Sequence, residues 1–239
     1  MEEIIHFDQQ LLLALNGSGS PVLDRFFMMV TCTGTWIPLL LLLLYIILKN
    51  RPWREALFFF IGMALVVLIA DRFTSGFCKP TVHRFRPSHE PALEGLVDLV
   101  GDYRGGLYGF ISSHAANTFG LWTFIALYLR RRGITFTVLL WACLSSYSRI
   151  YLGLHYPGDI LCGALFGICD GILCLGIFLY ACQRIGLPLR PQWPVAPTAL
   201  GYNSNPEGIQ SRDVRLFTVA FLITLLVMII LSFIPGLFV

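Results

Sequence analysis

Three short segments of the 239-residue chain hold the side chains that could do chemistry. "KPTVHRFRP" at 79–87 holds a lysine and two arginines, "FISSHAANTF" at 110–119 holds two serines and a histidine, and "SRIYLGLHYPGD" at 148–159 holds an arginine, a histidine and an aspartate. Ammonium and guanidinium groups bind phosphate oxygens, and arginine can do so with two parallel hydrogen bonds. Two histidines can attack phosphorus and protonate a leaving oxygen. These residue types therefore indicate chemistry on a phosphate group.

The neighbours of these groups fit the same chemistry. Ser112 and Ser113 stand before an apolar run, where hydroxyls and free backbone N–H groups meet the positive end of a helix dipole. Asp159 follows His155 by four residues, and a carboxylate beside a histidine fixes its tautomer and stabilises the charged ring. Phosphoryl transfer depends mainly on positioning and electrostatic stabilisation. The groups expected to converge are Lys79, Arg86, His114, Arg149, His155 and Asp159.

The composition predicts that these groups are carried by membrane-spanning helices. Hydrophobic residues make up 56% of the chain, charged residues 13%, and the mean hydropathy is +0.72, whereas soluble domains contain about 25% charged residues. The net charge of +3 is small and scattered, which argues against nucleic-acid binding. Six of the seven cysteines fall in apolar runs and no Cys-x-x-Cys pair occurs, which argues against a redox or zinc site.

Hydropathy predicts an all-α polytopic membrane protein with a single domain over residues 1–239. A span needs about 20 mostly apolar residues, and six stretches approach or reach that length, at 26–48, 56–77, 112–129, 134–150, 160–182 and 216–238. Before them, "IIHFDQQLLLALNGSGSP" has apolar residues at helical spacing and ends in turn residues, which predicts an N-terminal interfacial helix or a helix packed on the bundle. Glu2 and Glu3 do not suit a secretory signal, so the first span should insert uncleaved.

Basic residues predict the orientation, because cytoplasmic loops are enriched in them. The loops after the first, third and fifth spans carry ten: Lys49, Arg51, Arg54, Arg130, Arg131, Arg132, Arg184, Arg190, Arg212 and Arg215. The opposite side carries seven: Arg25, Arg72, Lys79, Arg84, Arg86, Arg104 and Arg149. The three chemical segments then share the extracytoplasmic face, in a membrane that we expect to be a bacterial inner membrane.

The order and spacing of these residues resemble the type 2 phosphatidic acid phosphatase family, whose motifs are K-x6-R-P, P-S-G-H and S-R-x5-H-x3-D. Lys79, Arg86 and Pro87 fill the first motif, and Ser148, Arg149, His155 and Asp159 fill the third. The second is met in part by Ile111, Ser112, Ser113 and His114, where isoleucine replaces proline and serine replaces glycine. The added hydroxyl of Ser113 can compensate for the lost glycine.

The resemblance implies a haloperoxidase-like helical core and hydrolysis of a phosphate or diphosphate headgroup without a metal or other cofactor. It implies that His155 forms a phosphohistidine, that Asp159 orients it, and that His114 acts first as acid and then as base. Five residues would hold phosphate: Lys79, Arg86, Ser112, Ser113 and Arg149. The partners implied are the membrane and a lipid phosphate, with isoprenyl diphosphates such as undecaprenyl diphosphate, phosphatidylglycerol phosphate, phosphatidic acid and lipid A phosphates all open, as is the oligomeric state.

Other readings of the same residues remain. A zinc or magnesium ion held by His114, His155 and Asp159 would be repelled by the surrounding cations. A lipid phosphate transporter should hold its charges near the midplane, whereas here they gather at one face. Phosphotransfer to an acceptor other than water would use the same site. His83, Arg84 and His89 match no fixed motif position, and we expect them to face headgroups or substrate.

Overall fold

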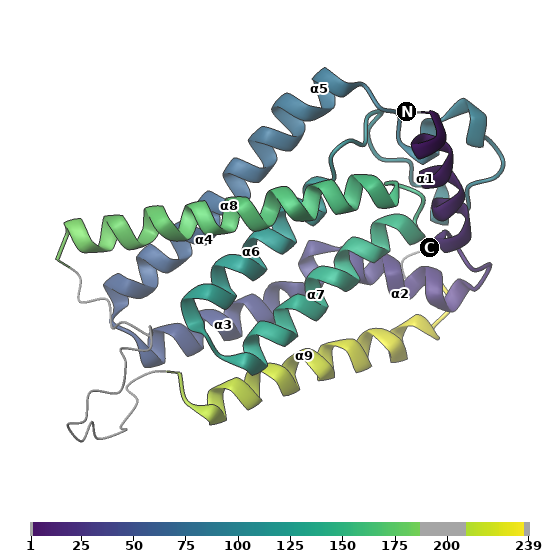
Figure 1. The fold of residues 1–239 in the computed structure, drawn as a ribbon. Coiled ribbons are helices and arrows are strands. Elements are labelled where there is room, and N and C mark those ends of the chain that lie inside the picture. Colours follow the sequence, from purple (N-terminus) through teal and green to yellow (C-terminus); the bar gives the residue numbers. More distant parts are fainter. Residues whose placement is uncertain (1, 187–208, 237–239) are drawn as a thin grey trace.

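The computed structural model describes residues 2–186 and 209–236, and this part of the chain folds as a bundle of helices (Figure 1). The α-helices are α1 Glu2–Leu15, α2 Pro21–Thr31, α3 Ile37–Asn50, α4 Trp53–Phe73, α5 Lys79–Val82, α6 Ser113–Leu129, α7 Arg132–Tyr151, α8 Pro157–Arg184 and α9 Ser211–Ser232. Short 3-10 turns cover Thr33–Trp36, Pro87–His89, Pro91–Leu93 and Val100–Asp102. The described residues form no β-strand, so the prediction of an all-α protein is confirmed.

Within residues 2–186 and 209–236, four helical stretches are long and apolar enough to cross a membrane, so the chain is an integral membrane protein. They are Thr33–Asn50, Trp53–Val82, Pro157–Arg184 and Ser211–Ser232. The spans expected at 112–129 and 134–150 correspond to α6 and α7, which have 17 and 20 residues. The count of six spans stays a prediction.

The expectation of one continuous helix over residues 26–48 is wrong. α2 ends at Thr31, Cys32 has extended backbone, and a 3-10 turn at Thr33–Trp36 leads into α3. Two side chains of this turn stabilise the break, because they bind carbonyls in the last turn of α2, where the regular helical hydrogen bonds end. Thr35 Oγ1 donates to the Met29 carbonyl at 2.9 Å, and Trp36 Nε1 donates to that of Val30, also at 2.9 Å.

α4 and α5 form one long helix that carries the first chemical segment to the end of the bundle (Figure 1). A π-helical turn at Thr74–Cys78 joins them. Pro80 has no N–H and its ring crowds the carbonyl four residues earlier, so the wider turn accommodates it. The helix ends at His83, whose backbone is left-handed with φ 54°. Lys79 therefore lies one turn before the chain leaves the helix.

Small residues bring α6 and α8 into backbone contact. A Cβ placed on Gly163 would lie 2.5 Å from the Ser112 carbonyl oxygen, and one on Gly167 would lie 2.3 Å from that of Ala116. Helices with small residues four apart pack this closely in membranes. The packing sets the start of α6 beside the start of α8, where the Ser112 N–H donates to the Asp159 carbonyl at 3.1 Å.

Helix α1 lies across the same end of the bundle as the starts of α6 and α8 (Figure 1). It buries Leu12 completely, while Ile4 and Phe7 are 73% and 65% exposed. Asn16, just after α1, donates to the Tyr151 carbonyl at 2.7 Å and accepts from the Asp98 N–H at 2.7 Å. α1 is thus attached to the bundle, and its exposed apolar side chains suit the predicted interfacial position.

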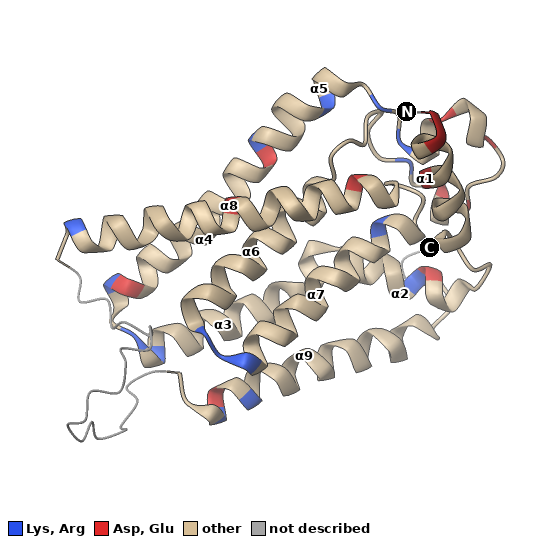
Figure 2. Ribbon diagram, in the orientation of Figure 1, with Lys and Arg blue, Asp and Glu red and all other residues tan. Residues whose placement is uncertain are grey.

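Charged residues gather toward the two ends of the bundle (Figure 2). At the end away from α1, Lys49 forms a 2.7 Å ion pair with Asp213, which also accepts from Asn50 at 2.8 Å. This pair joins the end of α3 to the start of α9. The other end holds the chemical segments.

Candidate active site

The structure brings all eight predicted site residues to the end of the bundle that α1 covers. Each lies at a helix end or in an adjoining loop: Lys79 begins α5, Arg86 follows α5, Ser112 caps α6, Ser113 and His114 begin α6, Arg149 lies in the last turn of α7, His155 lies between α7 and α8, and Asp159 lies in the first turn of α8. The predicted order of the spans, which returns all three segments to one face of the membrane, had predicted this convergence.

The ammonium group of a lysine and several hydroxyls meet at the start of α6. Lys79 Nζ donates to Ser113 Oγ at 2.9 Å, and the hydroxyls of Thr74 and Ser113 are 2.7 Å apart. Ser112 is fully buried, and its Oγ accepts from the Ala115 N–H at 3.4 Å as an N-cap. A cation, hydroxyls and a helix N-terminus together form a site suited to an anion.

Two arginines add buried positive charge. Arg86 and Arg149 are 8% and 5% exposed. The Arg86 guanidinium donates to the carbonyls of Tyr108 at 3.3 Å and Leu154 at 3.4 Å, while Arg149 donates to Thr31 Oγ1 at 2.7 Å. These partners are neutral, so the arginines are held in place without being neutralised by them. Asp159 interacts electrostatically with Arg86, but among the described residues neither arginine has a carboxylate within 4.0 Å. Buried cations that lack an ion-pair partner favour an anionic ligand.

The start of α8 sets His155 against Asp159. Pro157 suits the first position of a helix, and Asp159 Oδ2 turns back to accept the Tyr156 N–H at 3.1 Å. The same oxygen lies 3.4 Å from His155 Nδ1. Both side chains are almost fully buried. The Nδ1 edge of the ring therefore faces a carboxylate, as in an oriented histidine base or nucleophile.

The electrostatics keep His155 neutral. Burial lowers the pKa of His155 well below its ordinary value, and the charges of Arg86, Arg149 and Lys79 lower it further, while the Gly109 carbonyl opposes them. His114 interacts electrostatically with the same three cations and with His155. A neutral imidazole keeps the lone pair that a nucleophile needs.

Arg84 is part of this site, contrary to the expectation that it faces headgroups or substrate. Its guanidinium bridges two carboxylates, Asp159 Oδ1 at 2.9 Å and Asp8 Oδ2 at 2.7 Å. It also lies over the Tyr156 ring, 4.0 Å from the centroid. Burial opposes its charge, but Asp159 and Asp8 outweigh burial and raise the pKa of Arg84 above its ordinary value.

Asp8 connects α1 to the start of α8. Besides Arg84, its carboxylate accepts the Gly158 N–H through Oδ1 at 2.8 Å. A Cβ at Gly158 would lie 2.7 Å from Asp8 Oδ2, so a larger residue there would displace the carboxylate from this position. Sequence reasoning missed this contact, and its only signal was that Asp8 is the one acidic residue within the apolar pattern of the first helix.

Gly109 closes the site from the loop before α6. A Cβ at Gly109 would lie 3.0 Å from Asp159 Oδ2, 3.2 Å from Arg86 Cγ and 3.5 Å from His155 Nδ1. No side chain fits there without displacing one of these groups. Gly109 belongs to no motif considered above, and nothing in the sequence distinguished it from its neighbouring glycines.

Comparison with known proteins shows the family to which the chain belongs. The sequence profile of the PAP2 superfamily matches residues 55–183, more than half of the chain and all three motifs. The chain belongs to the PAP2 superfamily. Similar proteins include a lipid A 4'-phosphatase of Bacteroides thetaiotaomicron, 40% identical over 84% of this chain and 88% of the relative. A lipid A 4'-phosphatase of Porphyromonas gingivalis is 39% identical over 77% of this chain and 78% of the relative.

A solved structure agrees with this assignment. The crystal structure of Aquifex aeolicus LpxE superposes with a TM-score of 0.51 at 25% identity, covering 70% of this PAP2 chain and 93% of that one. The resemblance to the type 2 phosphatidic acid phosphatases is thus confirmed, and this PAP2 protein is a membrane lipid phosphatase, a phosphoric monoester hydrolase.

Proposed function

We propose that this protein removes a phosphate from a phosphorylated glycolipid of the lipid A class, through a phosphohistidine on His155 and without a metal. The observation that carries the substrate class is the identity of about 40% over most of the chain with two lipid A 4'-phosphatases. Dolichyldiphosphatase 1 of Homo sapiens is 34% identical over only 38% of the chain, which gives an isoprenyl diphosphate less support.

In the first step of the proposed mechanism, neutral His155 attacks phosphorus through Nε2, because Nδ1 is turned toward Asp159. A P–N bond forms, the P–O bond to the lipid breaks, and the lipid oxygen takes a proton from His114, whose charged form the bound phosphate anion stabilises. Lys79, Arg86 and Arg149 stabilise the charge on the phosphate oxygens, and the hydroxyls and N–H groups at the start of α6 add to them. Asp159 stabilises the positive charge that develops on the His155 ring.

In the second step, water replaces the imidazole. His114 accepts a proton from the attacking water, the P–N bond breaks, and inorganic phosphate leaves. His155 returns to its neutral state and His114 is again protonated. The two steps sum to hydrolysis of a phosphate monoester, with no co-reactant besides water. Arg84 acts in neither step directly and holds Asp159 in position.

The proposed location is a bacterial inner membrane with the site on the extracytoplasmic face. The distribution of basic residues supports this orientation. The Lys49–Asp213 ion pair lies at the end that would be cytoplasmic. The orientation can be tested by introducing a cysteine into the 90–106 loop and labelling it from outside intact cells. A cysteine that reacts only after lysis would contradict the extracytoplasmic location of the site.

Phosphate release from a panel of lipid phosphates by purified protein, in excess chelator, tests the function. The panel contains an acylated glucosamine phosphate, phosphatidic acid and an isoprenyl diphosphate. We expect the protein to have its highest kcat/KM with the glucosamine lipid and to remain active in the presence of the chelator. His155→Ala should lose about 10⁴-fold or more in kcat, as enzymes do without their nucleophile. A folded His155→Ala variant with ordinary turnover would refute the mechanism, and loss of activity with chelator would refute metal independence.

A further inference from the structure

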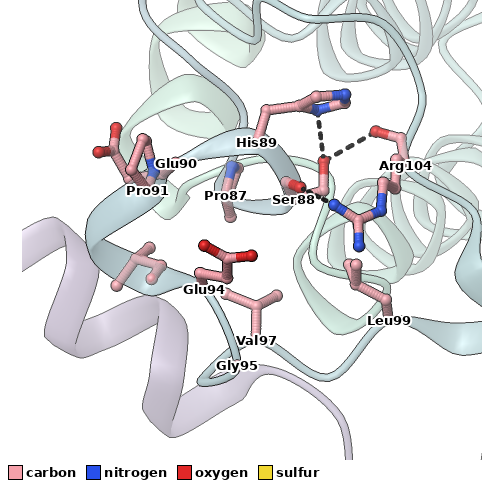
Figure 3. A pocket seen from close by; sticks show the side chains of 11 residues that line it. Pro87, Ser88, His89, Glu90, Pro91, Glu94, Gly95, Val97, Leu99 and Arg104 are labelled. Carbon is pink, nitrogen blue, oxygen red and sulfur yellow. Dashed lines mark hydrogen bonds between the residues drawn. The ribbon is translucent and has the colours of Figure 1, made fainter.

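A pocket lies beside the catalytic centre, within the loop that joins α5 to α6 (Figure 3). Its volume is about 240 Å³. Pro87, Pro91, Leu93, Val97 and Leu99 supply apolar walls, and His89, Glu90, Glu94 and Arg104 supply polar groups. Figure 3 shows the Glu94 carboxylate and the Arg104 guanidinium pointing into the hollow from different sides. Binding sites commonly combine apolar walls with a few placed polar groups.

The pocket lies next to Arg86, one of the groups proposed to hold phosphate. Pro87, which lines the pocket, directly follows Arg86 in the sequence. On the other side of the pocket Arg104 precedes Gly105, where a Cβ would lie 3.1 Å from the Arg86 guanidinium. A lipid whose phosphate reaches Arg86 therefore has the pocket within reach of the next part of its headgroup.

The pocket is held in shape by contacts of its own. Ser88 Oγ donates to the Arg104 carbonyl at 2.8 Å, and the Arg104 guanidinium donates to the Ser88 carbonyl at 3.3 Å. Leu93 packs with Leu12 of α1 and with Tyr156, which follows His155. The walls are thus attached to the catalytic centre and to α1, so the pocket has a fixed position relative to His155.

Its charges favour an uncharged ligand with many hydroxyls. Glu90 and Glu94 carry two negative charges and Arg104 carries one positive charge, which disfavours a second phosphate. Burial and the charges of Arg104 and Arg86 lower the pKa of His89, so at neutral pH its ring can both donate and accept. Among the described residues, no acidic group lies within 4.0 Å of the Arg104 guanidinium, so the donors that do not bind the Ser88 carbonyl are available to a ligand.

We infer that this pocket binds the sugar ring next to the scissile phosphate, which deepens the proposed glycolipid function and rests on it. A hexosamine ring presents an apolar C–H face to the proline, leucine and valine walls. Its hydroxyl and amide edges pair with carboxylates, a guanidinium and an imidazole, which offer both acceptors and donors. The pocket therefore selects glycolipid phosphates over lipid phosphates that lack a ring.

A comparison of two substrates tests the pocket. The kcat/KM for an acylated glucosamine phosphate is divided by that for phosphatidic acid, measured in the same detergent. Losing a hydrogen bond to a charged group should cost about 10-fold, so Glu94→Ala and Arg104→Ala should each lower this ratio by about 10-fold through the glucosamine lipid alone. Glu94→Gln keeps an acceptor oxygen and should lose less.

Asp102→Asn is the matched control, because it removes a negative charge from the same loop at an exposed position outside the pocket. It should leave the ratio unchanged. Unchanged ratios in Glu94→Ala and Arg104→Ala, or equal losses on both lipids, would overturn the sugar pocket and leave the proposed function standing. A parent protein that hydrolyses phosphatidic acid but not the glucosamine lipid would instead refute the proposed substrate class, and the pocket assignment with it.

Discussion

Replacing Arg84 tests whether the catalytic carboxylate is positioned from outside the family's motifs. Arg84 donates to Asp159 at 2.9 Å and to Asp8 at 2.7 Å, and its own side chain is 22% exposed while that of Asp159 is fully buried. Arg84→Ala leaves two carboxylates close to one another without the cation between them. Removing one partner of a buried pair costs about 3–5 kcal/mol, and the partial exposure of Arg84 places the cost at the lower end.

The effect on catalysis follows from the geometry at His155. Asp159 has two oxygens, of which Oδ1 binds Arg84 and Oδ2 faces His155. Without the Arg84 contact the carboxylate can rotate, and the ring loses its fixed orientation in a fraction of molecules. In metal sites, loss of the partners that orient a histidine or carboxylate commonly costs about 10–100-fold in activity, and the same kind of orientation is lost here. We expect kcat for phosphate release to fall by about that factor, with KM little changed because Arg84 does not bind the phosphate.

Two further variants separate positioning from stability. Arg84→Lys keeps the charge but cannot bridge both carboxylates with a planar fork, so it should recover stability more than kcat. Arg72→Ala removes an exposed arginine near the same end of α4 and should change neither. Thermal unfolding in detergent reports stability alongside phosphate release. An Arg84→Ala variant with parental kcat, or one whose defect lies entirely in KM, would refute the positioning role.

Three further predictions address the centre, the helix packing and the pH response. Gly109→Ala should lower kcat about 10-fold with little loss of stability, because its Cβ would press on Asp159 and Arg86; phosphate release at saturating substrate measures this, and unchanged turnover would contradict it. Gly167→Ala should lower the free energy of unfolding by about 1–3 kcal/mol, since its Cβ meets a backbone carbonyl of α6 that cannot give way; denaturation in detergent is the test. The pKa of His155 lies well below its ordinary value in the folded protein, so below about pH 6.5 the unfolded chain takes up a proton that the folded chain does not. The free energy of unfolding should therefore decrease as the pH falls, and its slope should be steeper in the parent than in His155→Gln by up to about 1.4 kcal/mol per pH unit. Parallel curves for the two proteins would refute the lowered pKa of His155.

The sequence predicted the chemical centre better than the elements around it, for a physical reason. Chemistry restricts residue types at fixed spacing, and helices that cross a membrane must return to one of two faces, so Lys79, His114 and His155 could be placed together without coordinates. The break at Thr33–Trp36 was missed because apolar residues continue through it. Hydropathy does not register the extended backbone at Cys32 or the carbonyls that Thr35 and Trp36 bind.

The contacts that α1 makes with distant segments could not be predicted from the sequence. Asp8 and Gly158 are 150 residues apart, and neither position has a spacing or pattern that indicates the other. The family profile covers residues 55–183, so α1 lies outside the part that carries the three motifs. Yet Asp8 binds both the N-terminus of α8 and the arginine that holds Asp159. The motifs supply the reacting groups, whereas the orientation of Asp159 also depends on a helix that the motifs do not include. Variation in α1 among related proteins should therefore change turnover even where all three motifs are kept.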